Sequence, residues 1–222
     1  MARVGTVCEV VLPCRDEAPA LPGVLARLPA GFDPIVVDNG STDGTADVAR
    51  AHGATVVFES RAGYGAAVHA GVLAASATYL AVLDGDGSMD AADLSRLLGL
   101  VDSGAATMAV GRRRPVGRGV WPWHARVGTA AIVWWLRRRS GLAVHDIAPM
   151  RVCRRQDLLA LDLQDRRFGY PLELLLRAAE AGWRVLEVDI AYSTRAAGTH
   201  SKVSGSLRGT VRTAHDFARV LS

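Results

Sequence analysis

Short apolar runs alternate, along the first half of the chain, with segments whose apolar residues recur at helical spacing. The apolar runs predict strands at residues 7–12, 34–38, 55–59, 79–83 and 106–110. The segments between them predict helices at residues 18–28, from 42 or 43 to about 52, 63–76 and 90–101. Strands that alternate with helices of this length are typical of a parallel sheet with helices on both faces.

The second half of the chain has a less regular pattern. It predicts helices at residues 122–139, 171–181 and 207–221 and strands at 148–153 and 184–192. Residues 195–205 are polar and rich in Gly and Ser, which predicts a loop. The chain has 222 residues, no internal repeat and no long linker. We therefore expect one α/β domain with a Rossmann-like, mostly parallel sheet.

Charge is distributed unevenly along the chain. Of the 26 basic residues, all but Lys202 are Arg, and the formal net charge is +4. Residues 112–155 hold eleven Arg and a single acid, Asp146. This segment therefore carries +10 and leaves −6 for the remainder of the chain. Such a basic segment is expected to face an anionic partner, such as phosphates, nucleic acid or a lipid surface.

Trp and Arg residues gather at the two ends of a short apolar helix within residues 121–139. This pattern is typical of an interfacial helix, so we expect peripheral membrane contact through 121–139. The alternative is a Trp pair packed in the core beside an Arg-coated surface. The longest nearly apolar run, 127–136, is about half of the ~20 residues that a membrane span needs, so no transmembrane helix is expected.

The cysteines indicate a reducing compartment. Cys8, Cys14 and Cys153 are odd in number and scattered, which disfavours a disulfide framework and a zinc site. The apolar stretch at the N-terminus is short and is interrupted by Glu9, unlike a signal peptide. We expect a cytoplasmic protein, with peripheral contact at the inner membrane face.

Three of the predicted strands end in acidic or turn-forming residues. These ends are Pro13-Cys14-Arg15-Asp16-Glu17, Asp38-Asn39-Gly40-Ser41-Thr42-Asp43 and Asp84-Gly85-Asp86. In an open parallel sheet, ligands bind at the carboxyl ends of the strands. Arg112 follows the fifth predicted strand at the same edge, which makes it a candidate for a ligand's diphosphate.

Asp84 and Asp86 are the sharpest candidate site. Two carboxylates separated by one residue after a strand can share a hard cation, and Mg²⁺ or Mn²⁺ then keeps coordination places open for phosphates. The alternative is an Asp-Gly turn, which this sequence would also form.

A second glycine-containing motif, Gly63-Tyr64-Gly65-Ala66, does not match a dinucleotide fingerprint, because the third Gly is missing. It predicts a helix start that passes close to a ligand or to another backbone. The sequence contains neither a P-loop lysine motif nor a Gly-x-Ser-x-Gly elbow.

Taken in order, these motifs resemble the family 2 glycosyltransferases. The resemblance lies in residues 10–17, 35–45, 63–66 and 83–87 of the first 115 residues. In the second half, Asp146-x-x-Pro149-Met150-Arg151, residues 170–174, residues 185–190 and Arg195-x-x-Gly198-x-x-Ser201-Lys202 resemble the dolichyl-phosphate mannose synthase and polyprenyl-phosphate glycosyltransferase branch.

The resemblance implies a GT-A fold, with residues 1–115 binding a nucleotide sugar and residues 116–222 binding the acceptor. GDP-mannose or a UDP-hexose would be the donor, and Asp84 and Asp86 would hold Mg²⁺ or Mn²⁺. The residues implied for the donor are Pro13, Arg15, Glu17, Asp38, Gly40, Gly65 and Asp84, with Arg195, Ser201 and Lys202 closing over the phosphates from loop 195–205.

The implied reaction is direct displacement at the anomeric carbon, with inversion, onto a polyprenyl phosphate. Asp146 and Glu173 are the candidate bases. A phosphate acceptor is already ionised near pH 7 and needs little general base, whereas an alcohol acceptor would need one. The chain departs from many members of the branch at Ser88, where they carry Gln, and at Pro149-Met150, where Gly-Phe is expected.

Three alternatives stay open at this point. A glycosyltransferase could act on a soluble or cell-envelope alcohol. A basic module could bind nucleic acid without catalysis, although the acidic strand ends would repel a polyanion, so no nucleic acid is expected. A nucleotidyltransferase would need a Gly-rich basic loop after the first strand, where this chain has Cys14-Arg15-Asp16-Glu17.

Overall fold

The computed structural model describes residues 8–117 and 119–198, except for the side chain of His124. In this part of the chain the strands are β1 (Cys8–Cys14), β2 (Phe32–Asp38), β3 (Thr55–Phe58), β4 (Tyr79–Val82), β5 (Met108–Pro115), β6 (Met150–Arg154) and β7 (Val185–Tyr192). The helices are α1 (Leu21–Ala26), α2 (Thr45–Ala51), α3 (Tyr64–Ala74), η1 (Ala91–Asp93), α4 (Leu94–Asp102), α5 (Trp123–Ser140), α6 (Arg155–Ala160) and α7 (Tyr170–Glu180). The predicted helix 207–221, Ser201 and Lys202 lie outside the described residues.

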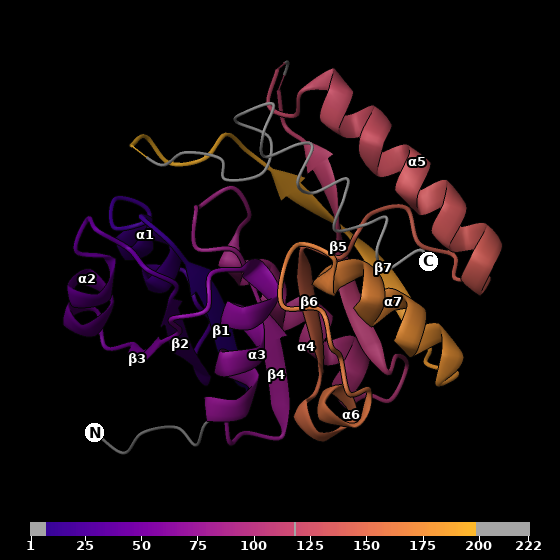
Figure 1. Cartoon of the computed structure of the whole chain (residues 1–222), viewed down its shortest axis with the longest axis horizontal. Coiled ribbons are helices and arrows are strands. Elements are labelled where there is room, and N and C mark those ends of the chain that lie inside the picture. Colours follow the sequence, from indigo (N-terminus) through magenta and orange to yellow (C-terminus); the bar gives the residue numbers. More distant parts are fainter. Residues whose placement is uncertain (1–7, 118, 199–222) are drawn as a thin grey trace.

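These strands form one sheet in the order β3-β2-β1-β4-β6-β5-β7 (Figure 1). Neighbouring strands are parallel except at β6, which runs antiparallel to both β4 and β5. The prediction of a single α/β domain with a mostly parallel sheet is confirmed.

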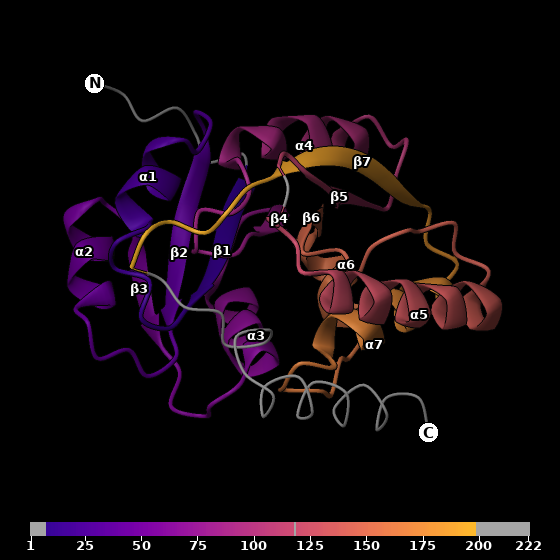
Figure 2. The same ribbon diagram turned by 90° about the horizontal axis from the view of Figure 1, so that it is seen from above.

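Helices cover both faces of the sheet (Figure 2). Because successive side chains of a strand point to opposite faces, Val10 and Leu12 pack with α1, α2 and α4, whereas Val11 packs with α3. Helices α5, α6 and α7 cover the same face as α3. Burial on both faces accounts for the nearly continuous apolar sequence of β1.

Strand β5 is longer than its apolar run predicts. It continues beyond residue 110 through three arginines to Pro115, because β7 pairs with it along its whole length. Asp189 of β7 lies opposite Arg112 and pairs with Arg114 at 2.8 Å. Side-chain alternation then turns Arg113 to the other face of the sheet.

Two further features were not settled by the sequence. Helix α6 was not predicted, because its six residues contain too little periodicity. In α5, Trp134 is 59% exposed, whereas Trp135 is half-buried against the core, so the two Trp side chains are not packed in the core as a pair. Membrane contact of this helix stays a prediction. None of the helices in the described part of the chain is long and apolar enough to cross a membrane.

Candidate active site

The carboxyl ends of β1, β2 and β4 lie next to each other at one edge of the sheet. Cys14 at the end of β1 is paired with Asp38 at the end of β2. The amide of Leu83, directly after β4, donates to the Val11 carbonyl of β1 at 3.1 Å. The loops with acidic residues that follow these strands are therefore neighbours, as their parallel pairing requires.

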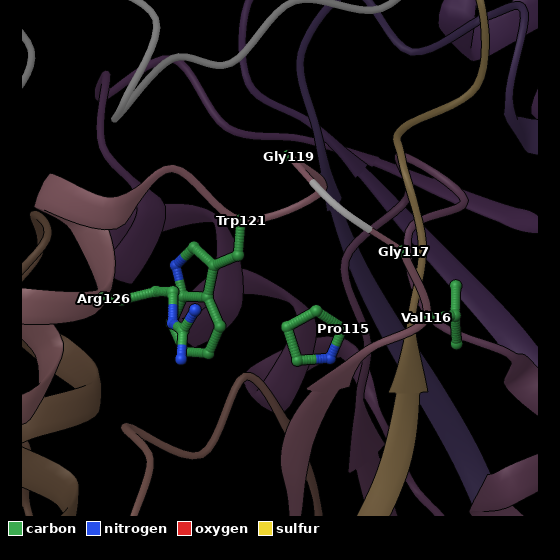
Figure 3. A pocket seen from close by; sticks show the side chains of 6 residues that line it. All are labelled: Pro115, Val116, Gly117, Gly119, Trp121 and Arg126. Carbon is green, nitrogen blue, oxygen red and sulfur yellow. The ribbon is translucent and has the colours of Figure 1, made fainter.

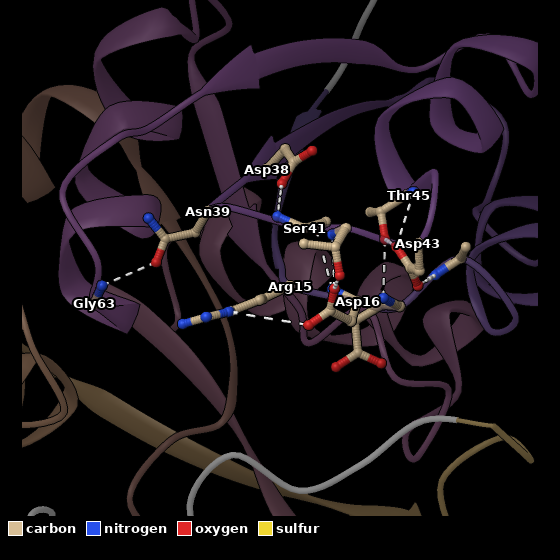
Figure 4. Close-up of polar contacts among 11 residues, drawn as sticks. Arg15, Asp16, Asp38, Asn39, Ser41, Asp43, Thr45 and Gly63 are labelled. Atoms are coloured by element: carbon tan, nitrogen blue, oxygen red, sulfur yellow. Dashed lines mark hydrogen bonds and ion pairs between the residues drawn. The ribbon is translucent and has the colours of Figure 1, made fainter.

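Hydrogen bonds from backbone amides to side-chain oxygens hold the loops after β1 and β2 together (Figure 4). Asp16 accepts a hydrogen bond from the amide of Thr42 at 2.8 Å, and Asp43 accepts one from the amide of Ala18 at 3.0 Å. The hydroxyl of Ser41 accepts one in return from the Asp16 amide at 3.0 Å. These hydrogen bonds fix the shape of the two loops, residues 15–18 and 39–43, which together are called the rim below.

The residues that the sequence assigns to the nucleoside surround the same rim. Glu17 and Asp38 are buried, Arg15 has a half-exposed side chain, and Pro13 belongs to β1. Gly40 has a φ of +84°, a left-handed conformation that glycine adopts without strain. Contact of these residues with a nucleotide stays a prediction.

Asn39 connects the rim to the next strand and helix, and the sequence had given it no role beyond a turn. Its Nδ2 donates to the carbonyls of Glu59 at 2.8 Å and Arg61 at 2.9 Å. Its Oδ1 accepts from the amide of Gly63 at 2.9 Å (Figure 4). Asn39 therefore positions the start of α3 relative to the end of β2.

Asp86 is the centre of the polar contacts after β4. Its side chain is buried, its Oδ1 accepts from the Ser88 amide at 2.9 Å, and its Oδ2 lies 3.1 Å from Nη1 of Arg195. The amide of Ala196 also donates to the Asp86 carbonyl at 3.0 Å. The start of the late loop is thereby held at the Asp-x-Asp motif, where the sequence predicts that Arg195 acts.

The negative charges of Asp84 and Asp86 repel each other. Burial, and after it the charge of Asp86, raises the pKa of Asp84 to about 6, although Arg195, Arg151 and Arg113 act in the other direction. A divalent cation would neutralise the pair, and carboxylate oxygens are ligands that Mg²⁺ and Mn²⁺ prefer. No group of three or more His, Cys, Asp or Glu that could hold a metal ion occurs among the described residues, so the two carboxylates are the candidates in this part of the chain. The residues present fit such a cation.

Asp146 is fully engaged by a neighbouring arginine. Its Oδ2 accepts from the amide of Arg113 at 3.0 Å and from its Nε at 2.8 Å. Its Oδ1 accepts from Nη2 of Arg113 at 2.6 Å and from the Ile147 amide at 2.8 Å. Its side chain is 1% exposed, and each of its oxygens accepts two hydrogen bonds. The geometry argues against the prediction of Asp146 as a base.

Aromatic rings and a second carboxylate complete the surroundings of this ion pair. The Arg113 guanidinium lies 4.2 Å from the ring centre of Trp121 and 5.4 Å from that of Tyr192. Glu187 of β7 accepts from the amides of His145 at 2.6 Å and Asp146 at 2.9 Å. Arg113 is therefore held in one orientation from three sides.

Glu173, the other candidate base, is also engaged. Its Oε1 accepts from the Gln164 amide at 2.9 Å and its Oε2 from the Asp165 amide at 2.7 Å. Both oxygens thus bind the loop before α7, which argues against the prediction that Glu173 is a base.

A contact of Arg112 with the donor diphosphate stays a prediction. The Nε of Arg112 lies 4.0 Å from Asp189, on the side of the sheet that carries Arg114. The arginine of this strand whose charge acts on Asp84 is Arg113. Strict side-chain alternation along a longer strand would have identified it from the sequence.

Arg151 of β6 is a further site residue, and the sequence gave it no role. It is fully buried, donates to the Ala148 carbonyl at 2.9 Å and to the Tyr64 hydroxyl at 3.3 Å, and its charge acts on Asp84. The rings of Tyr64 and Tyr170 lie 5.9 and 5.7 Å from its guanidinium. The buried guanidinium of Arg151 thus favours the charged form of Asp84.

The Gly63-Tyr64-Gly65-Ala66 motif brings two backbones together. The amide of Gly65 donates to the Arg167 carbonyl at 3.0 Å, and that of Ala66 donates to the Arg166 carbonyl at 2.8 Å. A Cβ on Gly65 would lie 2.6 Å from the Asp165 carbonyl oxygen. The sequence predicts that this motif lies close to a ligand or to another backbone, and the structure shows the close backbone. A direct role of Gly65 in donor binding stays a prediction.

Replacing Gly65 by alanine is expected to lower the free energy of unfolding by about 1–3 kcal/mol, because the added methyl group clashes with backbone. Urea denaturation measures the change. Gly128 of α5 is the matched control, since a Cβ there meets no atom within 4 Å. Gly128→Ala is expected to be stabilising by up to about 1 kcal/mol. Equal unfolding midpoints for Gly65→Ala and the unmodified protein would contradict this interpretation.

The single domain with its mostly parallel sheet and helices matches the GT-A fold of nucleotide-sugar transferases. Within this class, residues 9–156 match the family model described as glycosyl transferase family 2, and the chain belongs to this family. It is a hexosyltransferase that uses a nucleotide-sugar donor.

The relatives differ in what their names say of the acceptor. An uncharacterized glycosyltransferase of Mycobacterium tuberculosis is 59% identical over 218 residues, 98% of this chain and 99% of that protein. The polyprenol monophosphomannose synthase of Mycolicibacterium smegmatis is 35% identical over 218 residues, 89% of this chain and 81% of that protein. A solved structure with the same fold is that of glucosyl-3-phosphoglycerate synthase from Mycobacterium tuberculosis in complex with Mn²⁺, UDP and glucosyl-3-phosphoglycerate. Its TM-score is 0.75 at 22% identity, and the match covers 99% of this chain and 80% of that one.

Proposed function

We propose that this enzyme transfers a hexose from a nucleotide sugar to a polyprenyl phosphate, with inversion at the anomeric carbon and with Mg²⁺ or Mn²⁺ held by Asp84 and Asp86. The proposal assigns the chain to the polyprenyl-phosphate branch of its family. The likeness to the polyprenol monophosphomannose synthase supports this assignment. A membrane-lipid acceptor also sets the reaction at the cytoplasmic membrane surface.

The donor would bind along the rim at the strand ends. Arg15, Glu17 and Asp38 would contact the nucleoside, and Arg195 would exchange its contact with Asp86 for one with the diphosphate. A cation on the two carboxylates would counter the negative charge that grows on the departing diphosphate. Arg113 and Arg151 remain fixed beside Asp84 and contribute positive charge without moving.

We choose a phosphate acceptor over an alcohol because both candidate bases are occupied by hydrogen bonds within the protein. Asp146 and Glu173 already accept hydrogen bonds at every carboxylate oxygen. An alcohol would need one of them to remove its proton, whereas a phosphate oxygen is already ionised near pH 7. That oxygen would form the new bond to the anomeric carbon while the bond to the diphosphate breaks. The geometry therefore favours a phosphate acceptor.

A hollow of about 590 Å³ at the end of β5 is suited to such an amphiphile. Pro115, Val116 and Trp121 line it with apolar atoms, and Arg126 adds a positive charge (Figure 3). Trp121 in turn stacks on Arg113, so the hollow adjoins the buried ion pair. We propose that the first prenyl units lie here and that the phosphate points toward Arg113.

The test is a transfer assay with GDP-mannose and UDP-glucose, each with Mn²⁺, and three acceptors: polyprenyl phosphate, the corresponding free polyprenol and 3-phosphoglycerate. We expect glycolipid from the polyprenyl phosphate and no product from the polyprenol, which matches it except for the phosphate. Transfer to the polyprenol or to phosphoglycerate, with none to the lipid phosphate, would contradict the proposed acceptor.

A further inference from the structure

The first half of helix α5 is not packed into the core. Among the described side chains from Trp123 to Ala131, none is buried, whereas Val133 and Leu136 in the second half are. Figure 1 shows α5 along the outer side of the molecule, with one end beyond the sheet. A helix half with no buried side chain gains little from tertiary packing, so another environment is needed to explain its sequence.

The exposed side of α5 is apolar at helical spacing. Trp123 is 76% exposed, Val127 60% and Trp134 59%, and Ala130 and Ala131 are exposed between them. Positions 123, 127, 130 or 131 and 134 follow one stripe of a helix. Large exposed apolar side chains in such a stripe mark an interaction surface.

Arginines surround this stripe, and no acid interrupts them. Arg126 lies near its start and Arg137, Arg138 and Arg139 at its end, and no carboxylate of the described residues pairs with any of them within 4.0 Å. The sequence has no Asp or Glu between residues 103 and 145. The guanidinium of Arg138 lies 4.7 Å from the ring centre of Trp134. The charges and the apolar stripe thus form one surface.

A shallow groove of about 520 Å³ lies between α5 and β5 beside this surface. Its lining includes Val133, Trp134, Arg137, Arg138, Arg112 and His145. Arg112 lies 4.0 Å from Asp189 and His145 lies 2.8 Å from Glu187. Arg137 and Arg138 therefore supply the charge of the groove that no carboxylate of the described residues balances. The groove could take an anionic headgroup beside an apolar contact.

From these observations we infer that the exposed face of α5 binds an anionic phospholipid surface, with Trp134 in the headgroup layer and the arginines on lipid phosphates. Trp and Arg beside an apolar stripe of moderate length suit the interface between water and lipid. A two-fold contact of this face with a second copy would bring the same arginines together, which disfavours self-association. The inference rests on the proposed function only in linking this face to the acceptor.

Vesicle sedimentation without donor or acceptor tests the inference separately from the proposed function. The probes are vesicles of phosphatidylcholine alone and of phosphatidylcholine with phosphatidylglycerol. We expect binding to the anionic vesicles only, and the double variant Trp134→Ala, Arg138→Gln should weaken it by about tenfold.

The matched control is the double variant Phe58→Ala, Arg50→Gln. Phe58 is also exposed and also carries a stacked arginine, at 5.4 Å, on a different part of the sheet. This control variant should bind vesicles as the unmodified protein does. The circular dichroism of both double variants should equal that of the unmodified protein. Equal binding to neutral vesicles, or equal loss in both double variants, would overturn the inference.

A turnover measurement links the face to the proposed acceptor. Trp134→Ala, Arg138→Gln should lose transfer to a long-chain polyprenyl phosphate in anionic vesicles but retain transfer to a short, water-soluble prenyl phosphate. If the unmodified protein binds vesicles as expected but transfers sugar to neither prenyl phosphate, the result would support the inference and contradict the proposed acceptor.

Discussion

Replacing Asp86 by asparagine is expected to lower kcat for sugar transfer by about 10³-fold, the largest effect of any single substitution in this protein. The amide keeps the oxygen that accepts from the Ser88 amide at 2.9 Å, so the turn after β4 should survive. What it removes is the negative charge shared with Asp84. Without that charge the pair loses its affinity for a divalent cation and hence its hold on the donor diphosphate.

Initial rates at saturating donor, over a series of Mn²⁺ concentrations, measure this effect. Asp47→Asn is the matched control, because Asp47 is 86% exposed on α2 and pairs only with Arg50, at 2.7 Å, among the described ion pairs. Its rate should equal that of the unmodified protein. A rate for Asp86→Asn within a few-fold of the unmodified protein would mean that the two carboxylates do not hold a catalytic cation.

Replacing Arg113 by methionine is expected to lower the free energy of unfolding by about 3–5 kcal/mol, because it leaves Asp146 buried without its counter-charge. Arg114→Met is the matched control on the same strand. Arg114 pairs with Asp189 at 2.8 Å, but both side chains are about half exposed, so its loss should cost about 1 kcal/mol or less.

Urea denaturation of Arg113→Met, Asp146→Asn and the double variant completes a thermodynamic cycle. The double variant should be more stable than Arg113→Met, since a neutral amide no longer needs the guanidinium. A role of Asp146 as the base would give another pattern: Asp146→Asn would lower kcat while leaving the free energy of unfolding unchanged. Equal destabilisation by Arg113→Met and Arg114→Met would contradict the structural role of the buried pair.

The alternation of apolar runs and helical segments was enough to predict the first half of the fold. Each of the strands β1 to β5 contains or overlaps its predicted run. For β1 and β2, which have parallel neighbours on both sides, the reason is burial of both faces of the strand. The parallel pairing of β1 and β2 also follows from this pattern, and with it the convergence of the acidic strand ends. Local sequence therefore indicated where the site lies.

What could not be predicted depends on contacts between distant parts of the chain. The extension of β5 through its arginines needs β7, about 75 residues later, as a partner. The pairing of Arg113 with Asp146 follows from that extension. Periodicity within one segment carries no information on such a partner.

Candidate bases illustrate the same limit at the level of side chains. The isolation of Asp146 in a basic segment was visible in the sequence, but nothing in the sequence showed that Arg113 occupies both of its oxygens. For Glu173, a position in the first turn of α7 was predictable, whereas its contact with the amides of Gln164 and Asp165 depends on the loop before the helix.

Direct measurement of Mn²⁺ binding is the sharpest test of a cation at Asp84 and Asp86, since it needs no knowledge of the acceptor. Electron paramagnetic resonance reports the free ion in the presence of the protein, with and without GDP or UDP. The unmodified protein should take up Mn²⁺ when a nucleoside diphosphate is present, and Asp86→Asn should not. Equal uptake by both, or no uptake by the unmodified protein with either nucleotide, would contradict a metal-dependent donor site.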